Sequence, residues 1–203
     1  MDNWNILNSA EIINGKVFAN GKLVQHIESD FKVASKELYK SCCKAYIKFF
    51  KMDALSKLGF LTNEILLKDF SLTNVNLNEV SLVIGNSNAT KETDLRYFQT
   101  ISDQPSPSVF VYTLPNILMG EICIKYGFKG QNLFFISEKF DEQELYENIK
   151  ILINNSTTEY VIGGWVDYID QRNYKSVLYL IGKDLKSSNF AKQKLKQLNH
   201  INC

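Results

Sequence analysis

Short apolar runs alternate with amphipathic helical segments along the second half of this chain, and this alternation constrains the fold more than any other feature. Buried strands are predicted at residues 80–85, 133–136, 160–166 and 176–182. Helices are predicted at residues 113–125 and 142–154, and the second carries Leu145, Ile149 and Leu152 on one face. Strands and helices in this order predict an α/β layered domain with a mixed, mostly parallel sheet of five strands and helices packed on it.

The first half of the chain is less regular. Asn14-Gly15 and Asn20-Gly21 are hairpin-turn dipeptides, so the opening residues are predicted to form short β segments. Residues 34–69 are predicted to be rich in helix, because apolar side chains recur there at helical spacing. Residues 86–108 are polar, contain Pro105 and Pro107, and are predicted to form turns.

Composition limits the class of protein. The 203 residues favour one domain over two, and 45% apolar with 22% charged residues excludes a disordered chain. Lys and Arg number 23 against 22 Asp and Glu, so the basic surface of a nucleic-acid-binding protein is not expected. The N-terminus lacks the pattern of a secretory leader, and the apolar runs are too short to span a bilayer, so we expect a cytoplasmic protein with no membrane partner.

Few residues offer chemistry of their own. His26 and His200 do not stand in a pattern typical of a catalytic triad, and His200 with Cys203 is a weak metal pair at the chain end, so no metal site is predicted. Cys42, Cys43 and Cys123 are interpreted as packing residues. Gly163-Gly164 permits close backbone approach but forms no phosphate loop, so no cofactor is predicted. The lysine-rich tail at 183–203 is interpreted as a solvated helix, with contact to an acidic partner as the alternative.

Five segments, taken in order over residues 50–185, resemble the N-terminal half of the β-ketoacyl synthases of the thiolase superfamily. They are MDALSKLGF at 52–60, VSLVIG at 80–85, PSVFVYTLPNILMG at 107–120, ICIKYGFKG at 122–130 and YVIGGWVD at 160–167. The first 50 residues match the family poorly. The resemblance implies that residues 1–203 form a single β-ketoacyl synthase N-terminal-like domain.

Two departures from the family decide the expected function. Counting without gaps from Gly130 puts the nucleophilic cysteine of the family on Lys139, where nearby carboxylates favour the charged, unreactive ammonium. Asp141 and Glu144 are interpreted as a helix cap in this stretch. The chain also stops before the half of the family fold that carries the two catalytic histidines. We therefore expect no ketosynthase catalysis, with Lys139 in a vestigial nucleophile position.

Half-length proteins of this kind resemble the chain-length-factor-like subunits of aryl polyene and flexirubin-type pigment clusters. The resemblance implies a non-catalytic accessory subunit of polyketide or fatty-acid-type biosynthesis. Its expected partner is a full-length β-ketoacyl synthase, or a second copy of itself, with an acyl carrier protein as a further candidate. The predicted interface residues are Phe134, Phe135, Ile136, Phe110 and Tyr112. Two alternatives stay open: a self-associating scaffold, and a stand-alone acyltransferase that uses Cys123 or Lys139.

Overall fold

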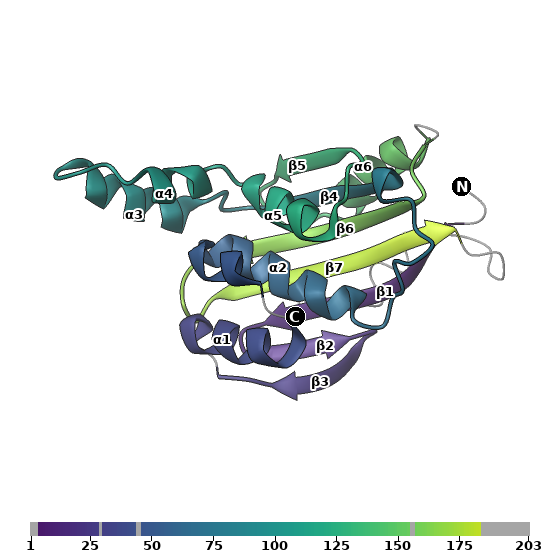
Figure 1. Ribbon diagram of the computed structural model, residues 1–203, viewed down its shortest axis with the longest axis horizontal. Helices are drawn as coiled ribbons and strands as arrows, with labels where there is room; N and C mark the ends of the chain where they lie inside the picture. Colours follow the sequence, from purple (N-terminus) through teal and green to yellow (C-terminus); the bar gives the residue numbers. More distant parts are fainter. Residues whose placement is uncertain (1–3, 29, 44–45, 155–156, 184–203) are drawn as a thin grey trace.

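A mixed sheet in the order β3-β2-β1-β7-β6-β4-β5 runs through the computed structural model (Figure 1). The structure describes the chain except for residues 1–3, 29, 44–45, 155–156 and 184–203. The seven strands are β1 (Trp4–Ile13), β2 (Lys16–Ala19), β3 (Lys22–His26), β4 (Val80–Asn86), β5 (Asn132–Ile136), β6 (Tyr160–Tyr168) and β7 (Tyr174–Lys183).

The α/β class is confirmed, but the sheet has seven strands instead of the expected five and is mostly antiparallel. Within the described residues the parallel pairings are those of β4 with β5 and of β4 with β6. The other four pairings, from β6 through β7, β1 and β2 to β3, are antiparallel. The difference arises because the opening hairpins join the sheet through β1, which pairs with β7 along almost its whole length.

The two asparagine–glycine turns were predicted correctly. Asn14 and Gly15 have φ values of 42° and 87°, and Asn20 and Gly21 have φ values of 50° and 73°. Tight hairpins need this left-handed conformation at both central residues, and asparagine followed by glycine tolerates it best. These turns fold residues 4–26 into an antiparallel meander at one side of the sheet.

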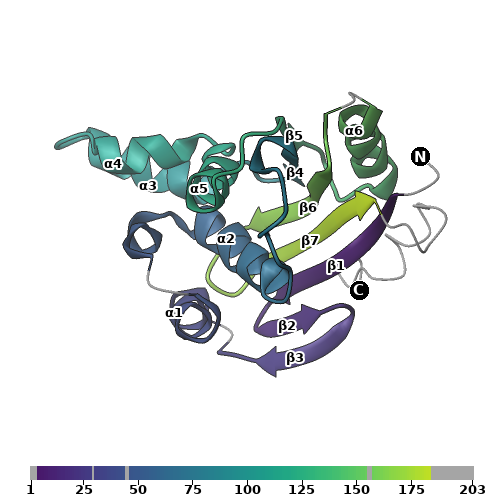
Figure 2. The same ribbon diagram turned by 45° about the vertical axis from the view of Figure 1, so that its right-hand side comes forward.

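Helices cover both faces of the sheet. The α-helices are α1 (Phe31–Cys42), α2 (Ala54–Leu67), α3 (Lys91–Ile101), α4 (Pro107–Phe110), α5 (Ile117–Tyr126) and α6 (Glu142–Asn154). The 3-10 helices in the described residues are η1 (Ile47–Lys51), η2 (Leu77–Glu79) and η3 (Val111–Thr113), which lie between the α-helices. One core cluster joins α1, α2 and α5 to the sheet, and a second joins α6 to it. Figure 2 shows α6 on the other side of the sheet from α1, α2 and α5. The predicted α6 stripe of Leu145, Ile149 and Leu152 is buried in this second cluster.

α3 and α4 form an arm that extends beyond the sheet at the carboxyl ends of β4 and β6 (Figures 1 and 2). The prediction of turns at 86–108 was therefore wrong, because α3 occupies Lys91–Ile101. Asp53 ties the base of the arm to α2: it caps α2 through the Ser56 N–H and accepts a hydrogen bond from Thr93 Oγ1 at 2.9 Å. Within the described residues no single helix is long and apolar enough to cross a membrane. Two helical segments joined at a sharp bend, Pro107–Thr113 and Ile117–Tyr126, are together long and apolar enough by length and composition alone.

Candidate functional site

The last strand of the sheet, β5, has a free edge. In the described part of the chain its one neighbour is β4. The two strands are parallel, and their register runs from Leu82 opposite Asn132 to Asn86 opposite Ile136. The Ser137 N–H donates to the Asn86 carbonyl, and the Gln131 carbonyl accepts from the Leu82 N–H. Because backbone groups of a strand point alternately to its two sides, residues 132, 134 and 136 direct their N–H and C=O groups to the open side. Such an edge is a template for another strand.

The three β5 residues predicted at an interface differ in their surroundings. Phe135 faces the α6 side of the sheet, where its ring centre lies 6.3 Å from that of Trp165 and its side chain covers Gly85. Phe134 packs partly against the cluster on the other face. Ile136 is 57% exposed at the end of the strand. Of these side chains, Ile136 is therefore the one most available to a partner.

Phe110 and Tyr112 lie on the arm and its junction with α5. The Phe110 ring is half exposed and contacts Tyr97 of α3, with 5.3 Å between ring centres. The Tyr112 hydroxyl donates to Glu121 Oε1 of α5 at 2.9 Å. Burial and the Glu121 carboxylate raise the pKa of Tyr112 above its ordinary range. The structure thus places Phe110 against α3 and Tyr112 against α5.

The arm carries an apolar surface that the sequence analysis missed. Leu95, Phe98 and Ile101 recur every three residues along α3, and Phe98 is 70% exposed. Helical periodicity could have revealed this stripe, but the neighbouring polar residues and prolines favoured turns. Contiguous exposed apolar residues of this kind mark contact surfaces in soluble proteins.

Lys139, the residue predicted at the family's nucleophile position, lies in the bend between β5 and α6. Lys139 is exposed there, and the next residue, Phe140, is buried with its ring centre 5.7 Å from that of Trp165. Asp141 caps α6, because its Oδ1 accepts hydrogen bonds from the N–H groups of Gln143 at 2.7 Å and Glu144 at 3.3 Å. The Asp141 half of the predicted helix cap is therefore confirmed.

The cysteines have the surroundings of packing residues. Cys123 is partly buried, and burial raises the pKa of its thiol, which keeps the sulfur protonated at neutral pH. Cys42 ends α1 and donates to the Leu38 carbonyl, with its sulfur 3.6 Å from that of Cys43. Hydrogen bonding between the two sulfurs lowers the pKa of Cys42 and raises that of Cys43.

No three-residue metal-binding group occurs among the described residues. His26 lies exposed at the end of β3. His200, Cys203 and the lysine-rich tail beyond Lys183 lie outside the described residues.

Comparison with known proteins links this architecture to a fold. No family model and no curated protein matches the chain. It superposes on the ishigamide ketosynthase/chain length factor with a TM-score of 0.66 and 11% identity, over 91% of this chain and 63% of that one. A ketosynthase in complex with its chain length factor from Xenorhabdus doucetiae gives a TM-score of 0.61 and 14% identity, over 97% of this chain and 90% of the matched chain. A type II polyketide synthase acyl-carrier protein in complex with its ketosynthase gives a TM-score of 0.62 and 11% identity, over 97% of this chain and 65% of the matched chain.

The chain therefore has the fold of ketosynthases and chain length factors, as the ordered motifs indicated. It spans 63% of the matched ishigamide chain but nine tenths of the matched chain from Xenorhabdus doucetiae. Because each match takes in at least 91% of this chain, it includes most of the first 50 residues, where the motifs were weak.

Proposed function

We propose that this chain is a non-catalytic, chain-length-factor-like accessory subunit, in which residues 1–203 form one β-ketoacyl synthase N-terminal-like domain. Its partner is a full-length β-ketoacyl synthase of polyketide or fatty-acid-type biosynthesis, such as the synthesis of an aryl polyene or a flexirubin-type pigment. The open edge of β5 carries this proposal, because an apolar strand with unpaired backbone groups needs a partner. The proposal is also supported by the matched chain of the Xenorhabdus doucetiae complex, which is similar to this chain in length, because the match covers 97% of this chain and 90% of that one.

The surroundings of Lys139 support a non-catalytic role. A ketosynthase-type nucleophile has to form a thioester, and a lysine in this position has no sulfur with which to form one. Lys139 also lies exposed in its bend, without the desolvation that activates a lysine nucleophile. The protonated, partly buried Cys123 supports packing over acyl transfer.

The apolar stripe of α3 and the half-exposed Phe110 extend the proposed contact surface beyond the strand. A stable interface buries roughly 800 Å² on each partner, which a strand of five residues does not supply alone. The arm provides additional apolar area. An acyl carrier protein is a further proposed partner, supported by the fold shared with a ketosynthase bound to one.

Ile136→Asp is expected to weaken the complex with a full-length ketosynthase from the same organism by at least ~100-fold, because it puts a charge against the apolar edge of the partner. Ile136→Pro is expected to act similarly: it removes an outward N–H and leaves the bonds between β5 and β4 in place. Ile136 suits this test better than Phe135, whose side chain packs inside the chain itself.

Ile151→Asp is the matched control. Ile151 is 55% exposed, close to the 57% of Ile136, and it lies on α6, which packs against β4 and β6. Affinities are measured by biolayer interferometry with the ketosynthase immobilised. Wild-type affinity of both Ile136 variants would contradict the β5 interface, and a homodimer lost in the same variants would favour the self-associating scaffold.

A further inference from the structure

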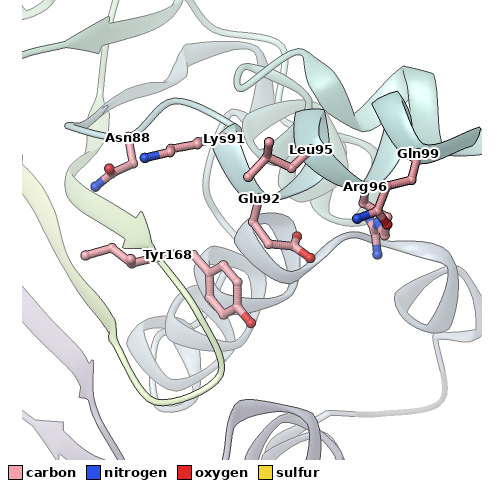
Figure 3. A pocket seen from close by; sticks show the side chains of 8 residues that line it. Asn88, Lys91, Glu92, Leu95, Arg96, Gln99 and Tyr168 are labelled. Carbon is pink, nitrogen blue, oxygen red and sulfur yellow. The ribbon is translucent and has the colours of Figure 1, made fainter. Parts of the chain in front are cut away.

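Three neighbouring hollows meet at Arg96 of α3. The first, of about 420 Å³, lies between the arm and the end of β6 and includes Glu92 and Tyr168 (Figure 3). The second, of about 290 Å³, shares Glu92 and Arg96 with it and extends to α1. The third, of about 610 Å³, shares Lys57 and Arg96 with the second and ends at Tyr112. We call these three hollows together the Arg96 groove.

The Arg96 groove is strongly basic in a chain that is nearly neutral overall. Six cations line it against one carboxylate, that of Glu92, whereas the whole chain has 23 basic and 22 acidic residues. The six are Lys32, Lys36, Lys51, Lys57, Lys91 and Arg96. In the part of the chain that the structure describes, none of them forms an ion pair within 4.0 Å. Their positive charge is therefore available to a bound anion.

The positive charges of the groove lie close enough to repel one another, as the pKa of Lys57 shows. Burial lowers the pKa of Lys57, and Arg96 and Lys36 lower it further through repulsion, while the Asp53 carboxylate acts in the opposite direction. Asp53 is already engaged by the Ser56 N–H and the Thr93 hydroxyl. Like charges held together at a partly buried site are stabilised by an anion that binds between them.

Tyr168 adds an independent sign of a ligand. This residue is 4% exposed and lines the first hollow, yet its hydroxyl oxygen is buried and lacks a hydrogen-bond partner among the described residues. Figure 3 shows its hydroxyl pointing to the same side of the hollow as the Glu92 carboxylate. A buried hydroxyl without a partner costs free energy that a ligand oxygen would recover.

The walls of the groove are apolar. Phe50 and Leu95 are each 58% exposed, and both line it. Ile169 and Val111 extend this surface at its two ends. A ligand that satisfies both the cations and these side chains needs a charged end and an apolar chain.

We propose that the Arg96 groove binds an amphiphilic anion, a phosphate or carboxylate group attached to an alkyl chain. Arg96 and Lys57 contact the anionic group, the Tyr168 hydroxyl donates to one of its oxygens, and the chain lies along Phe50 and Leu95. This site is separate from the β5 edge, although it shares Leu95 with the apolar stripe of α3. The inference does not rest on the proposed pairing, since the chain alone binds the ligand.

Dodecyl phosphate, titrated by calorimetry below its critical micelle concentration, tests the proposal. We expect saturable binding to the wild-type chain, about tenfold weaker binding to Arg96→Gln, and a several-fold loss in Tyr168→Phe, because charge-assisted hydrogen bonds are the strongest contacts available here. Dodecanoate is expected to bind as well, and the tighter of the two ligands identifies the head group. Inorganic phosphate is expected to bind far more weakly because it lacks the chain.

Two variants control for unspecific effects. Tyr174→Phe removes another buried tyrosine hydroxyl, on a ring that contacts Phe31 as Tyr168 does but does not line the groove. Lys150→Gln removes a positive charge on α6, away from the groove. Both are expected to bind dodecyl phosphate as the wild type does. Equal binding of dodecyltrimethylammonium, or undiminished binding by a thermally stable Arg96→Gln variant, would overturn the proposal, as would the absence of binding to the wild type.

Discussion

Gly164→Ala is expected to lower the free energy of unfolding by about 3 kcal/mol or more, because overpacking against backbone cannot be relieved by a change of rotamer. Gly164 lies on β6, and a methyl group there would overlap the carbonyl oxygen of Val177 and come within 3.0 Å of the Leu178 Cα. Both of these atoms belong to the backbone of β7, so relief requires β6 and β7 to separate in the middle of the sheet. Chemical denaturation followed by circular dichroism measures the loss.

Gly120→Ala is the matched control for this substitution. Gly120 lies within α5, and a methyl group there would meet no heavy atom within 4 Å. Alanine favours helix over glycine by up to ~1 kcal/mol, so this variant is expected to be as stable as the wild type or slightly more so. Equal stability of the two alanine variants would show that the β6–β7 spacing is looser than the structure indicates.

Lys125→Met is expected to lower the free energy of unfolding by about 3 kcal/mol, since it leaves a buried carboxylate without its counter-charge. Lys125 of α5 forms an ion pair with Glu64 of α2, which is 7% exposed, and the Tyr126 hydroxyl donates to the same carboxylate at 2.5 Å. The ammonium also lies 4.8 Å from the ring centre of Phe60. The pair thus joins α2 and α5, two of the helices that cover one face of the sheet.

The double variant Glu64→Leu, Lys125→Met is expected to recover most of this loss, because an apolar pair needs no counter-charge. Lys150→Met is the control: its pair with Glu147 spans 3.7 Å on the exposed face of α6 and contributes less than about 0.5 kcal/mol. A Lys125→Met variant as stable as Lys150→Met would contradict a structural role for the buried pair.

The local parts of the fold could be predicted from the sequence. α6 begins and ends where its apolar periodicity predicted, and β4, β6 and β7 lie within a few residues of the expected ranges. The paired glycines of β6 were interpreted as a site of close backbone approach, and Gly164 against Val177 confirms it. These features depend on neighbouring residues, whose pattern one sequence displays.

The missed features depend on residues that are distant in sequence or that face outward. The pairing of β1 with β7 joins Trp4 to Lys183, and no local pattern announces such a partner. α3 escaped prediction because Leu95 and Phe98 face outward and do not form a core stripe. The Arg96 groove brings together residues from Phe31 to Gln171, so its charge became visible only in the folded chain.

Native mass spectrometry of the chain co-expressed with a full-length ketosynthase from the same organism tests the proposed accessory role most directly. The account predicts a one-to-one complex of the two chains that survives transfer into the gas phase. A homodimer of this chain beside free ketosynthase would contradict the account.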